Sequence, residues 1–402
     1  MSQRIFITGT GIISCLGNNL QENLASLLST KSGLGKIHYI KTILKDELLV
    51  GEVPFDLDGL FDLAHINPSD AYSRNALLGI IAAKEAYDHA RVLENPGIET
   101  GLISATTVGG MDRCDLYYHD FLTNDSRNSY IDVYDCADST EKIASILKIK
   151  GFITTISTAC SSAANALMLG ARMIQTGHLD RVIAGGCEAL TKFHLNGFNA
   201  LKILDKSPCK PFDRHRAGIN LGEGAAYLVL ESESALKKTG NQPICELAGW
   251  GNACEAFHQT ASSPDGIGAL LAMKKALDLC GMKPESIDYI NAHGTGTDNN
   301  DLSEGRAIET LFGSSIPKIS STKPFTGHTT SAAGSIEAIL SILCIQQRVI
   351  WPNLNFEVPI NELHFSPVKT LINNANLNVV MSNSFGFGGN DTSLIFKKTS
   401  NI

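Results

Sequence analysis

The chain has 402 residues, of which 43% are hydrophobic and 18% are charged. This length and composition predict one large globular domain or two fused ones, and they exclude an intrinsically disordered chain. The formal net charge of -8 argues against a nucleic-acid-binding protein.

The cysteines argue for a reducing compartment. The 10 cysteines are scattered and form no C-x-x-C pair, which argues against a zinc or iron–sulfur site and against a disulfide scaffold. The first residues lack the apolar core of a signal peptide, and no stretch approaches the ~18–20 apolar residues of a membrane helix. We therefore expect a cytoplasmic protein without membrane insertion.

The first part of the chain predicts mixed α/β structure. Residues 5–7 predict a strand, and Gly9 and Gly11 predict a turn whose glycines allow close backbone packing. Residues 71–90 predict a long helix, and residues 102–106 a short strand. The polar and aromatic residues 111–140 predict an irregular insertion at a subunit contact or a pocket wall.

A strand–turn–helix–strand unit surrounds Cys160. Residues 151–157 have the β-branched content of a strand, residues 158–162 are small, and residues 163–174 have helical periodicity. The N–H groups and partial positive charge at a helix start favour a thiolate and an oxyanion, as in a nucleophile elbow. On this stretch alone, Cys160 is equally well a small buried hydrophobic residue.

Strands and helices alternate again after a polar segment at residues 232–241. The expected order is given by residues 244–248, 268–279, 287–292, 301–312, 319–321, 332–345, 379–384 and 393–396. This order predicts two similar α/β halves, residues 1–240 with the nucleophile and residues 241–402 with two histidines.

Those histidines, His293 and His328, each follow a predicted strand in a glycine-containing turn. The carboxyl ends of strands are the usual site positions in open α/β sheets, although single histidines there are more often structural. The glycine-rich residues 386–389 either turn backbone N–H groups inward or form a plain hairpin.

Four motifs together resemble the elongating β-ketoacyl-acyl carrier protein synthases. They are residues 157–162, residues 291–297, Lys323 with residues 327–328, and residues 386–389; residues 212–213 and 222–225 are also similar. The resemblance implies a thiolase-like fold, with two similar α/β halves in five layers (αβαβα), and a dimer. It also implies decarboxylative condensation of an acyl-enzyme thioester with malonyl-acyl carrier protein, without a cofactor or a required metal.

The resemblance implies a role for each motif. Cys160 is the nucleophile, and the backbone N–H groups of Cys160 and Phe387 form the oxyanion hole. His293 and His328 stabilise the enolate. Lys323 orients and polarises the site, and Glu304 is its acidic partner.

The resemblance also implies pocket and ion-binding residues. Phe387 is a gate, Val108 limits the depth of the acyl pocket, and Thr295 and Thr297 line the substrate pocket. A monovalent cation is held in some members at positions that match the following residues: Asn291, Glu337 and Asn383.

The pathway and the partners stay open. Asn390 and Asp391 depart from the usual threonine and asparagine, as residues 324–326 do from housekeeping enzymes, which points equally to fatty-acid elongation and to a polyketide, aryl-polyene or pigment branch. The expected cations are missing from residues 64–69. The alternative docking patch for the acidic carrier consists of Lys202, Lys206, Lys210, Arg214 and Arg216.

Three alternatives concern the kind of protein. The chain is a homodimer, or it is one subunit of a heterodimer with a chain-length-factor-like protein, or it is a non-catalytic partner with the same fold. A thiolase would need a second cysteine, which residues 381–391 lack. An initiating synthase would use Cys-His-Asn instead of Cys-His-His.

Overall fold

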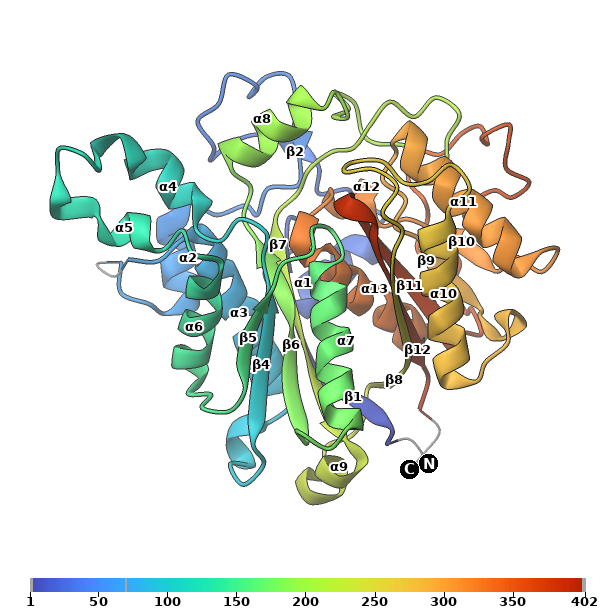
Figure 1. The fold of residues 1–402 in the computed structure, drawn as a ribbon, viewed down its shortest axis with the longest axis horizontal. Coiled ribbons are helices and arrows are strands. Elements are labelled where there is room, and N and C mark those ends of the chain that lie inside the picture. The colour runs from blue at the N-terminus through green and yellow to red at the C-terminus, as the bar shows by residue number, and fades with distance from the viewer. Residues whose placement is uncertain (1–2, 69–70, 400–402) are drawn as a thin grey trace.

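The structure is a computed structural model that describes residues 3–68 and 71–399. Ser69, in the cation-free segment 64–69, lies outside these ranges. Ten strands form one sheet in the order β10-β9-β11-β12-β8-β1-β7-β6-β4-β5 (Figure 1). The strands are β1 (Ile5–Ser14), β4 (Thr100–Ala105), β5 (Ile153–Ile156), β6 (Arg181–Glu188), β7 (Gly224–Ser232), β8 (Cys245–Cys254), β9 (Tyr289–Asn291), β10 (Lys318–Ser320), β11 (Val379–Gly386) and β12 (Asn390–Lys397), with a separate pair, β2 (Gly35–Lys36) and β3 (Leu49–Val50).

The α-helices of the described ranges are α1 (Leu20–Leu28), α2 (Leu57–Ala64), α3 (Arg74–His89), α4 (Met111–Tyr117), α5 (Ser129–Asp132), α6 (Cys136–Leu147), α7 (Ser162–Gln175), α8 (Lys192–Ala200), α9 (Glu233–Thr239), α10 (Ile267–Cys280), α11 (Asp298–Phe312), α12 (Lys323–Thr326) and α13 (Ala333–Gln347). The 3-10 turns are η1 (Val92–Glu94), η2 (Tyr118–Asp120), η3 (Asp125–Arg127), η4 (Pro284–Ser286), η5 (Thr330–Ala332) and η6 (Phe387–Gly389). None of the helices described is both long and apolar enough to cross a lipid bilayer.

The two halves of the sheet have the same strand order. In the first half the order is β5-β4-β6-β7-β1, and in the second it is β10-β9-β11-β12-β8. Each half runs strand, helix, strand, helix, strand, helix, strand, strand: α3, α6 and α7 connect the first, and α10, α11 and α13 connect the second. β1 and β8 pair antiparallel at the junction.

Five layers follow from the helices that cover these halves (Figure 1). α3 and α6 pack on the outer face of the first half, and α10 and α11 cover the outer face of the second. α7 and α13 lie between the halves and pack against each other. α13 is buried around its whole circumference, as expected for a helix that is apolar on all sides. The predicted fold of two similar halves in five layers is confirmed.

Two local predictions are wrong. β1 continues through Gly9 and Gly11, because these glycines let α3 approach: a Cβ at Gly9 would lie 2.3 Å from the Ala86 carbonyl oxygen. Residues 111–140 are not irregular; they form α4, η2, η3, α5 and the start of α6. The polar segment 232–241 contains α9, whose first turn is capped by the Ser232 side chain. The proposed boundary at residue 240 falls between α9 and β8.

Candidate active site

Cys160 lies in a sharp turn between β5 and α7. Ala159 has φ of 52°, in the left-handed region that residues other than glycine rarely adopt. The Ser162 hydroxyl accepts a hydrogen bond from the Thr158 N–H at 2.8 Å and donates one to the Ala159 carbonyl at 2.6 Å. These bonds hold the strained turn, which presents Cys160 at the start of α7.

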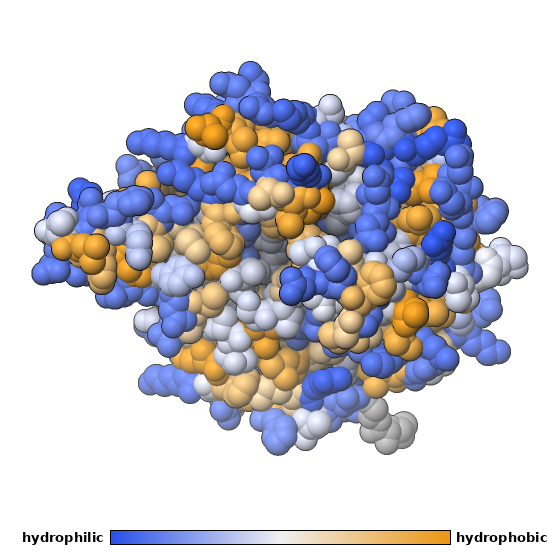
Figure 2. Space-filling model, turned by 45° about the horizontal axis from the view of Figure 1, so that its top comes forward, coloured by the Kyte–Doolittle hydropathy of each residue, from blue (hydrophilic) through white to orange (hydrophobic). Residues whose placement is uncertain are grey.

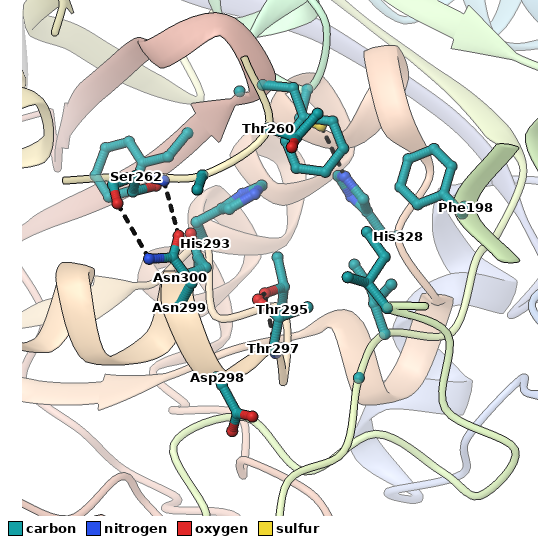
Figure 3. A pocket seen from close by; sticks show the side chains of 18 of the residues that line it. Phe198, Thr260, Ser262, His293, Thr295, Thr297, Asp298, Asn299, Asn300 and His328 are labelled. Atoms are coloured by element: carbon teal, nitrogen blue, oxygen red, sulfur yellow. Dashed lines mark hydrogen bonds between the residues drawn. The ribbon is translucent and has the colours of Figure 1, made fainter. Parts of the chain in front are cut away.

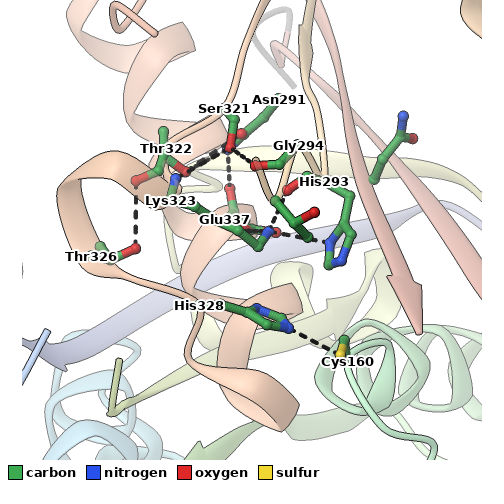
Figure 4. A network of polar contacts seen from close by, with 12 residues as sticks. Cys160, Asn291, His293, Gly294, Ser321, Thr322, Lys323, Thr326, His328 and Glu337 are labelled. Atoms are coloured by element: carbon green, nitrogen blue, oxygen red, sulfur yellow. Dashed lines mark hydrogen bonds and ion pairs between the residues drawn. The ribbon is translucent and has the colours of Figure 1, made fainter. Parts of the chain in front are cut away.

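Two other loops bring His293 and His328 to Cys160 (Figure 4). His293 follows β9, and His328 lies between β10 and α13. One ring nitrogen of each histidine and the Cys160 Sγ lie within 4.8 Å of one another, and the His328 Nε2 is 3.0 Å from Sγ. The two rings meet edge to face with centroids 5.3 Å apart. All three side chains are buried, so the site is an enclosed pocket.

The central helices explain why these loops meet. The β5–α7 loop with Cys160 and the β10–α13 loop with His328 occupy equivalent positions in the two halves. Gly334 in α13 lies against the start of α7, where an added Cβ would be 2.5 Å from the Ala164 nitrogen. A glycine there lets α7 and α13 approach closely enough for the sulfur and the imidazole to touch.

Lys323 determines the proton position on His293. Its Nζ lies 3.1 Å from the His293 Nδ1, 2.6 Å from the His293 carbonyl oxygen and 2.5 Å from the Glu337 Oε1 (Figure 4). An ammonium group only donates hydrogen bonds, so Nδ1 is an acceptor. A neutral His293 therefore carries its proton on Nε2.

The predicted pairing of Lys323 with Glu304 is wrong. The acidic partner of Lys323 is Glu337. The Glu304 carboxylate instead accepts hydrogen bonds from the backbone N–H groups of His293 and Gly294, at 2.9 and 2.8 Å, and from the Asn383 side chain at 3.1 Å. Burial raises the pKa of Glu304 to about 7, while these N–H bonds lower it. Glu304 thus holds the loop that carries His293.

Burial dominates the protonation of the site. It raises the pKa of the Cys160 thiol to about 11, and the Phe387 N–H and the Lys323 charge only partly counter this. Burial lowers the pKa of both His293 and His328 well below the ordinary value, and the Lys323 charge adds to the effect. Burial therefore favours a thiol and two neutral imidazoles, and it opposes the thiolate that the helix start favours.

Phe387 lies in η6, on the other side of the Cys160 sulfur. Its backbone N–H is directed at the sulfur, and its ring stacks on Phe198 of α8 with centroids 5.8 Å apart. Gly386 packs against the nucleophile turn, where an added Cβ would lie 3.2 Å from the Cys160 nitrogen. The two predicted oxyanion donors, the Cys160 and Phe387 N–H groups, are thus on neighbouring segments.

A cavity of about 230 Å³ connects this centre to the surface (Figure 3). Thr295 and Thr297 line this cavity, and their hydroxyl groups are 2.8 Å apart. Phe198 and Lys202 also line the cavity. The lining combines the aromatic rings of Phe198, Phe385 and Phe387 with polar side chains, including Ser262 and Asn299, as is usual for a ligand pocket.

Val108 does not line the cavity of Cys160. It lies in a second, more open cavity of about 630 Å³ with Tyr134 and Phe193. The loop that carries Val108 leaves β4 on the side of the α4–α5 insertion. The role of Val108 in limiting the acyl length stays a prediction, and it requires that the cavity of Val108 join the cavity of Cys160.

The three proposed cation ligands do not converge on one site, because their side chains make hydrogen bonds to different partners. The Asn291 amide donates to the Glu337 carbonyl oxygen at 3.3 Å, and the Glu337 carboxylate binds Lys323. The Asn383 amide contacts Glu304. One buried Glu337 oxygen, Oε2, has no hydrogen-bond partner in the described part of the chain. A cation site there stays a prediction.

Cys160, His293 and His328 also have the donor chemistry of a zinc site. The Lys323 ammonium, 3.1 Å from the His293 ring, opposes a second cation at this position. The three side chains are therefore better suited to moving and donating protons than to holding a metal ion.

The proposed carrier patch is only partly free. Lys202 lies at the cavity wall, whereas Lys206 pairs with Glu47 at 2.6 Å and Lys210 lies 3.8 Å from Glu357. Arg214 is exposed. Arg216 is directed at Asp298, 3.6 Å away. Docking at this patch stays a prediction.

Sequence reasoning missed two contributors. Phe198, on the unpredicted helix α8, supports the Phe387 ring. Asn390 was noted only as a departure from the family pattern, but its side chain contacts the nucleophile turn. The position of Asn390 directly after the glycine-rich turn is the sequence feature that could have indicated its contact with the site.

Comparison with known proteins agrees with this geometry. Residues 2–235 match the family model "Beta-ketoacyl synthase, N-terminal domain", and residues 244–357 match "Beta-ketoacyl synthase, C-terminal domain". A 3-oxoacyl-[acyl-carrier-protein] synthase 2 from Staphylococcus aureus (strain COL) is 32% identical over 411 residues, which is 99% of this chain and 99% of the relative.

Solved structures share the whole fold. The ishigamide ketosynthase/chain length factor superposes with a TM-score of 0.91 at 30% identity, over 100% of both chains. The ketosynthase ApeO in complex with its chain length factor ApeC, from Xenorhabdus doucetiae, gives a TM-score of 0.83 at 31% identity, over 99% of this chain and 98% of that one.

The chain belongs to the β-ketoacyl synthase family. It is a condensing acyltransferase with the thiolase-like fold of that family, so the predicted family, fold, reaction class and enzyme class are confirmed.

Proposed function

We propose that the chain extends an acyl group on Cys160 by two carbons taken from malonyl-acyl carrier protein. The observation that carries this proposal is the buried contact of 3.0 Å between the Cys160 Sγ and the His328 Nε2, with His293 beside it. Release of CO₂ supplies the carbanion, so the proposed steps involve no cofactor.

The first step transfers the acyl group to Cys160. Its sulfur bonds to the thioester carbonyl carbon while the thiol proton moves to the His328 Nε2. The bond from that carbon to the carrier sulfur then breaks, the carrier thiolate leaves and takes up a proton from water, and His328 keeps its proton on Nε2. The N–H groups of Cys160 and Phe387 stabilise the oxyanion.

The second step forms the new carbon–carbon bond. The bond from the malonyl methylene carbon to its carboxylate breaks, CO₂ leaves, and the electron pair forms a thioester enolate. The His293 Nε2–H, fixed by Lys323, and the His328 Nε2–H donate to the enolate oxygen. The enolate carbon attacks the acyl carbon on Cys160, the carbon–sulfur bond breaks, and the Cys160 sulfur takes its proton back from the His328 Nε2.

We also propose that the chain pairs with a chain-length-factor-like subunit in polyketide or polyene synthesis. The two structures with chain length factors support this. The insertion at α4 and α5 projects from the body and carries exposed apolar side chains, including Tyr118 and Leu122, which are 62% and 88% exposed (Figure 2, left). Exposed apolar patches of this kind mark interfaces. Ordinary fatty-acid elongation by a homodimer is the alternative, supported by the relative from S. aureus.

One experiment tests the reaction. The purified chain is incubated, alone and with a candidate partner subunit, with a panel of acyl-carriers and with malonyl-carrier, and the products are weighed by mass spectrometry. We expect a product two carbons longer. Cys160→Gln abolishes it but retains release of CO₂ from malonyl-carrier, whereas His328→Ala loses CO₂ release and keeps part of the self-acylation. Full condensation by Cys160→Gln refutes the nucleophile assignment.

Iodoacetamide tests the nucleophile assignment separately from condensation. We expect the wild type to be alkylated at Cys160; an unmodified Cys160 would contradict the assignment. Labelling followed by peptide mapping identifies the site, because Cys254 is also exposed.

A further inference from the structure

Asn390 links the two segments that carry the oxyanion donors. It is the first residue of β12, three positions after Phe387. Its side-chain oxygen accepts hydrogen bonds from the Ser161 hydroxyl at 2.7 Å, the Asn165 amide at 2.8 Å and the Asn252 amide at 2.9 Å. Ser161 directly follows Cys160, and Asn165 lies in the first turn of α7.

The neighbours fix the orientation of these amides. The Asn165 oxygen accepts the Thr392 hydroxyl at 2.8 Å, so its amide nitrogen must face Asn390 and the Thr158 hydroxyl. The Asn252 nitrogen contacts both the Asn390 oxygen and the Thr392 hydroxyl, each at 2.9 Å. The Asn390 oxygen is therefore an acceptor for three donors: Ser161 and Asn165 at the start of α7, and Asn252 in β8.

The turn between Phe387 and Asn390 closes the β11–β12 hairpin, whose pairing ends with Gly386 opposite Asn390. Gly388 and Gly389 have φ of 82° and 76°, and glycine leaves such a turn conformationally free. On its far side, the Gly388 N–H donates to the Gln259 carbonyl at 2.8 Å. On the side of the sulfur, Gly386 packs against the nucleophile turn, and the Asn390 side chain adds a hydrogen bond to Ser161 of that turn.

We propose that Asn390 is a positioning residue for acyl transfer, which keeps the Cys160 and Phe387 N–H groups at the separation that one oxyanion requires. The inference rests on the proposed function. Both donors must lie within about 2.7–3.1 Å of the same oxygen, and they belong to segments far apart in the sequence. The Asn390 side chain binds Ser161, the residue after Cys160, and Asn390 itself lies three residues after Phe387. It therefore links the two segments that carry the oxyanion donors.

The consequence is specific to one step. The tetrahedral intermediate of acyl transfer uses the two backbone donors, whereas malonyl decarboxylation uses the two histidines. Loss of Asn390 should therefore slow acylation without slowing decarboxylation. A merely structural role would slow both, because both use the same buried pocket.

The test compares Asn390→Ala, Ser161→Ala and the double variant with the wild type. Self-acylation of Cys160 by acyl-carrier is followed by rapid quenching and intact-protein mass spectrometry, and CO₂ release from malonyl-carrier is measured separately. Asn241→Ala is the matched control, because it loses two hydrogen bonds, to the Ala90 carbonyl and to Glu231, outside the site. Asn390→Ser replaces Asn390→Ala if the alanine variant is poorly folded.

We expect Asn390→Ala to lower the acylation rate by about 10- to 100-fold and to leave decarboxylation within about twofold. The double variant should acylate no more slowly than the slower single variant, because both remove the same link. The proposal is overturned by acylation within about threefold of wild type, by an equal loss of both steps, or by additive effects. A wild type that neither acylates nor decarboxylates would overturn the proposed function instead.

Discussion

Lys323 is a buried cation whose three N–H bonds all serve the active site. Two of them go to His293 and one goes to Glu337. A buried charge is tolerated only when it is paired, and its orientation then depends on its partner. The state of His293 therefore depends on a carboxylate that does not touch the substrate.

Glu337→Gln tests this dependence. The glutamine keeps the shape of the side chain but leaves the Lys323 charge unpaired, so we expect unfolding to become easier by about 3–5 kcal/mol. Decarboxylation should fall with it, because His293 loses its fixed orientation. Urea denaturation and CO₂ release are the measurements.

Glu304→Gln is the control for that prediction. Glu304 binds backbone N–H groups and not Lys323, so its neutral variant leaves the ion pair intact. A larger loss of stability in Glu304→Gln than in Glu337→Gln would contradict the assignment of the pair.

Asp391 predicts a pH dependence of stability. Burial raises its pKa to about 8, and the nearby charges of Glu255 and Glu304 add to this. A raised carboxyl pKa gives a contribution to stability that is complete below the ordinary value and is lost as the pH rises through about 8. Asp391→Asn should therefore raise the melting temperature at pH 9 and flatten its fall between pH 6 and pH 9, as measured by thermal unfolding. Parallel curves for the two proteins would contradict this reason.

At the scale of elements, β1 and α3 are in contact through glycine. A Cβ at Gly11 would lie 2.1 Å from the Ala82 carbonyl oxygen, which belongs to helix backbone and cannot turn away. Gly11→Ala should push α3 off the sheet and cost about 1–3 kcal/mol, read from urea denaturation. Gly97→Ala, where an added Cβ meets nothing within 4 Å, should change stability little. Equal effects would show that backbone entropy and not packing sets the cost.

The sequence predicted most regular elements because their periodicity reflects burial on one or both faces. The prediction was wrong where tertiary packing determines the local structure. In β1, for example, the two glycines are typical of a turn, but here they allow close contact between β1 and α3. The prediction also failed at α8, a helix with only Leu195 and His194 buried, whose pattern is weak.

The sequence predicted which residues form the candidate site, but it did not predict which of them interact with one another. The motifs identified Cys160, His293 and His328, because each follows a strand of the sheet. Spacing along the chain did not show that Glu337, one turn into α13, reaches Lys323 while Glu304 reaches backbone. Nor did it show that burial favours the protonated form of the Cys160 thiol, because desolvation depends on the packing of both halves.

At the scale of the whole molecule, the projecting insertion predicts association. Leu122 is 88% exposed on this arm, and Phe152 beside the edge strand β5 is 39% exposed. Replacement of both by glutamate should convert a dimer, with itself or with a partner subunit, to a monomer in size-exclusion chromatography with light scattering. Leu93→Glu is the control, because this 75%-exposed leucine lies on η1, away from the arm. An unchanged mass in the double variant would place the interface elsewhere.

The repeated architecture has one more consequence. Cys160 and His328 stand at matching places in the two copies of the motif, so the gap between sulfur and nitrogen spans the internal seam of the molecule. A rotation of one half against the other would lengthen that gap and would also act on the short β1–β8 pairing at the junction. The alkylation rate of the Cys160 thiol therefore reports how tightly the two halves of the molecule pack together.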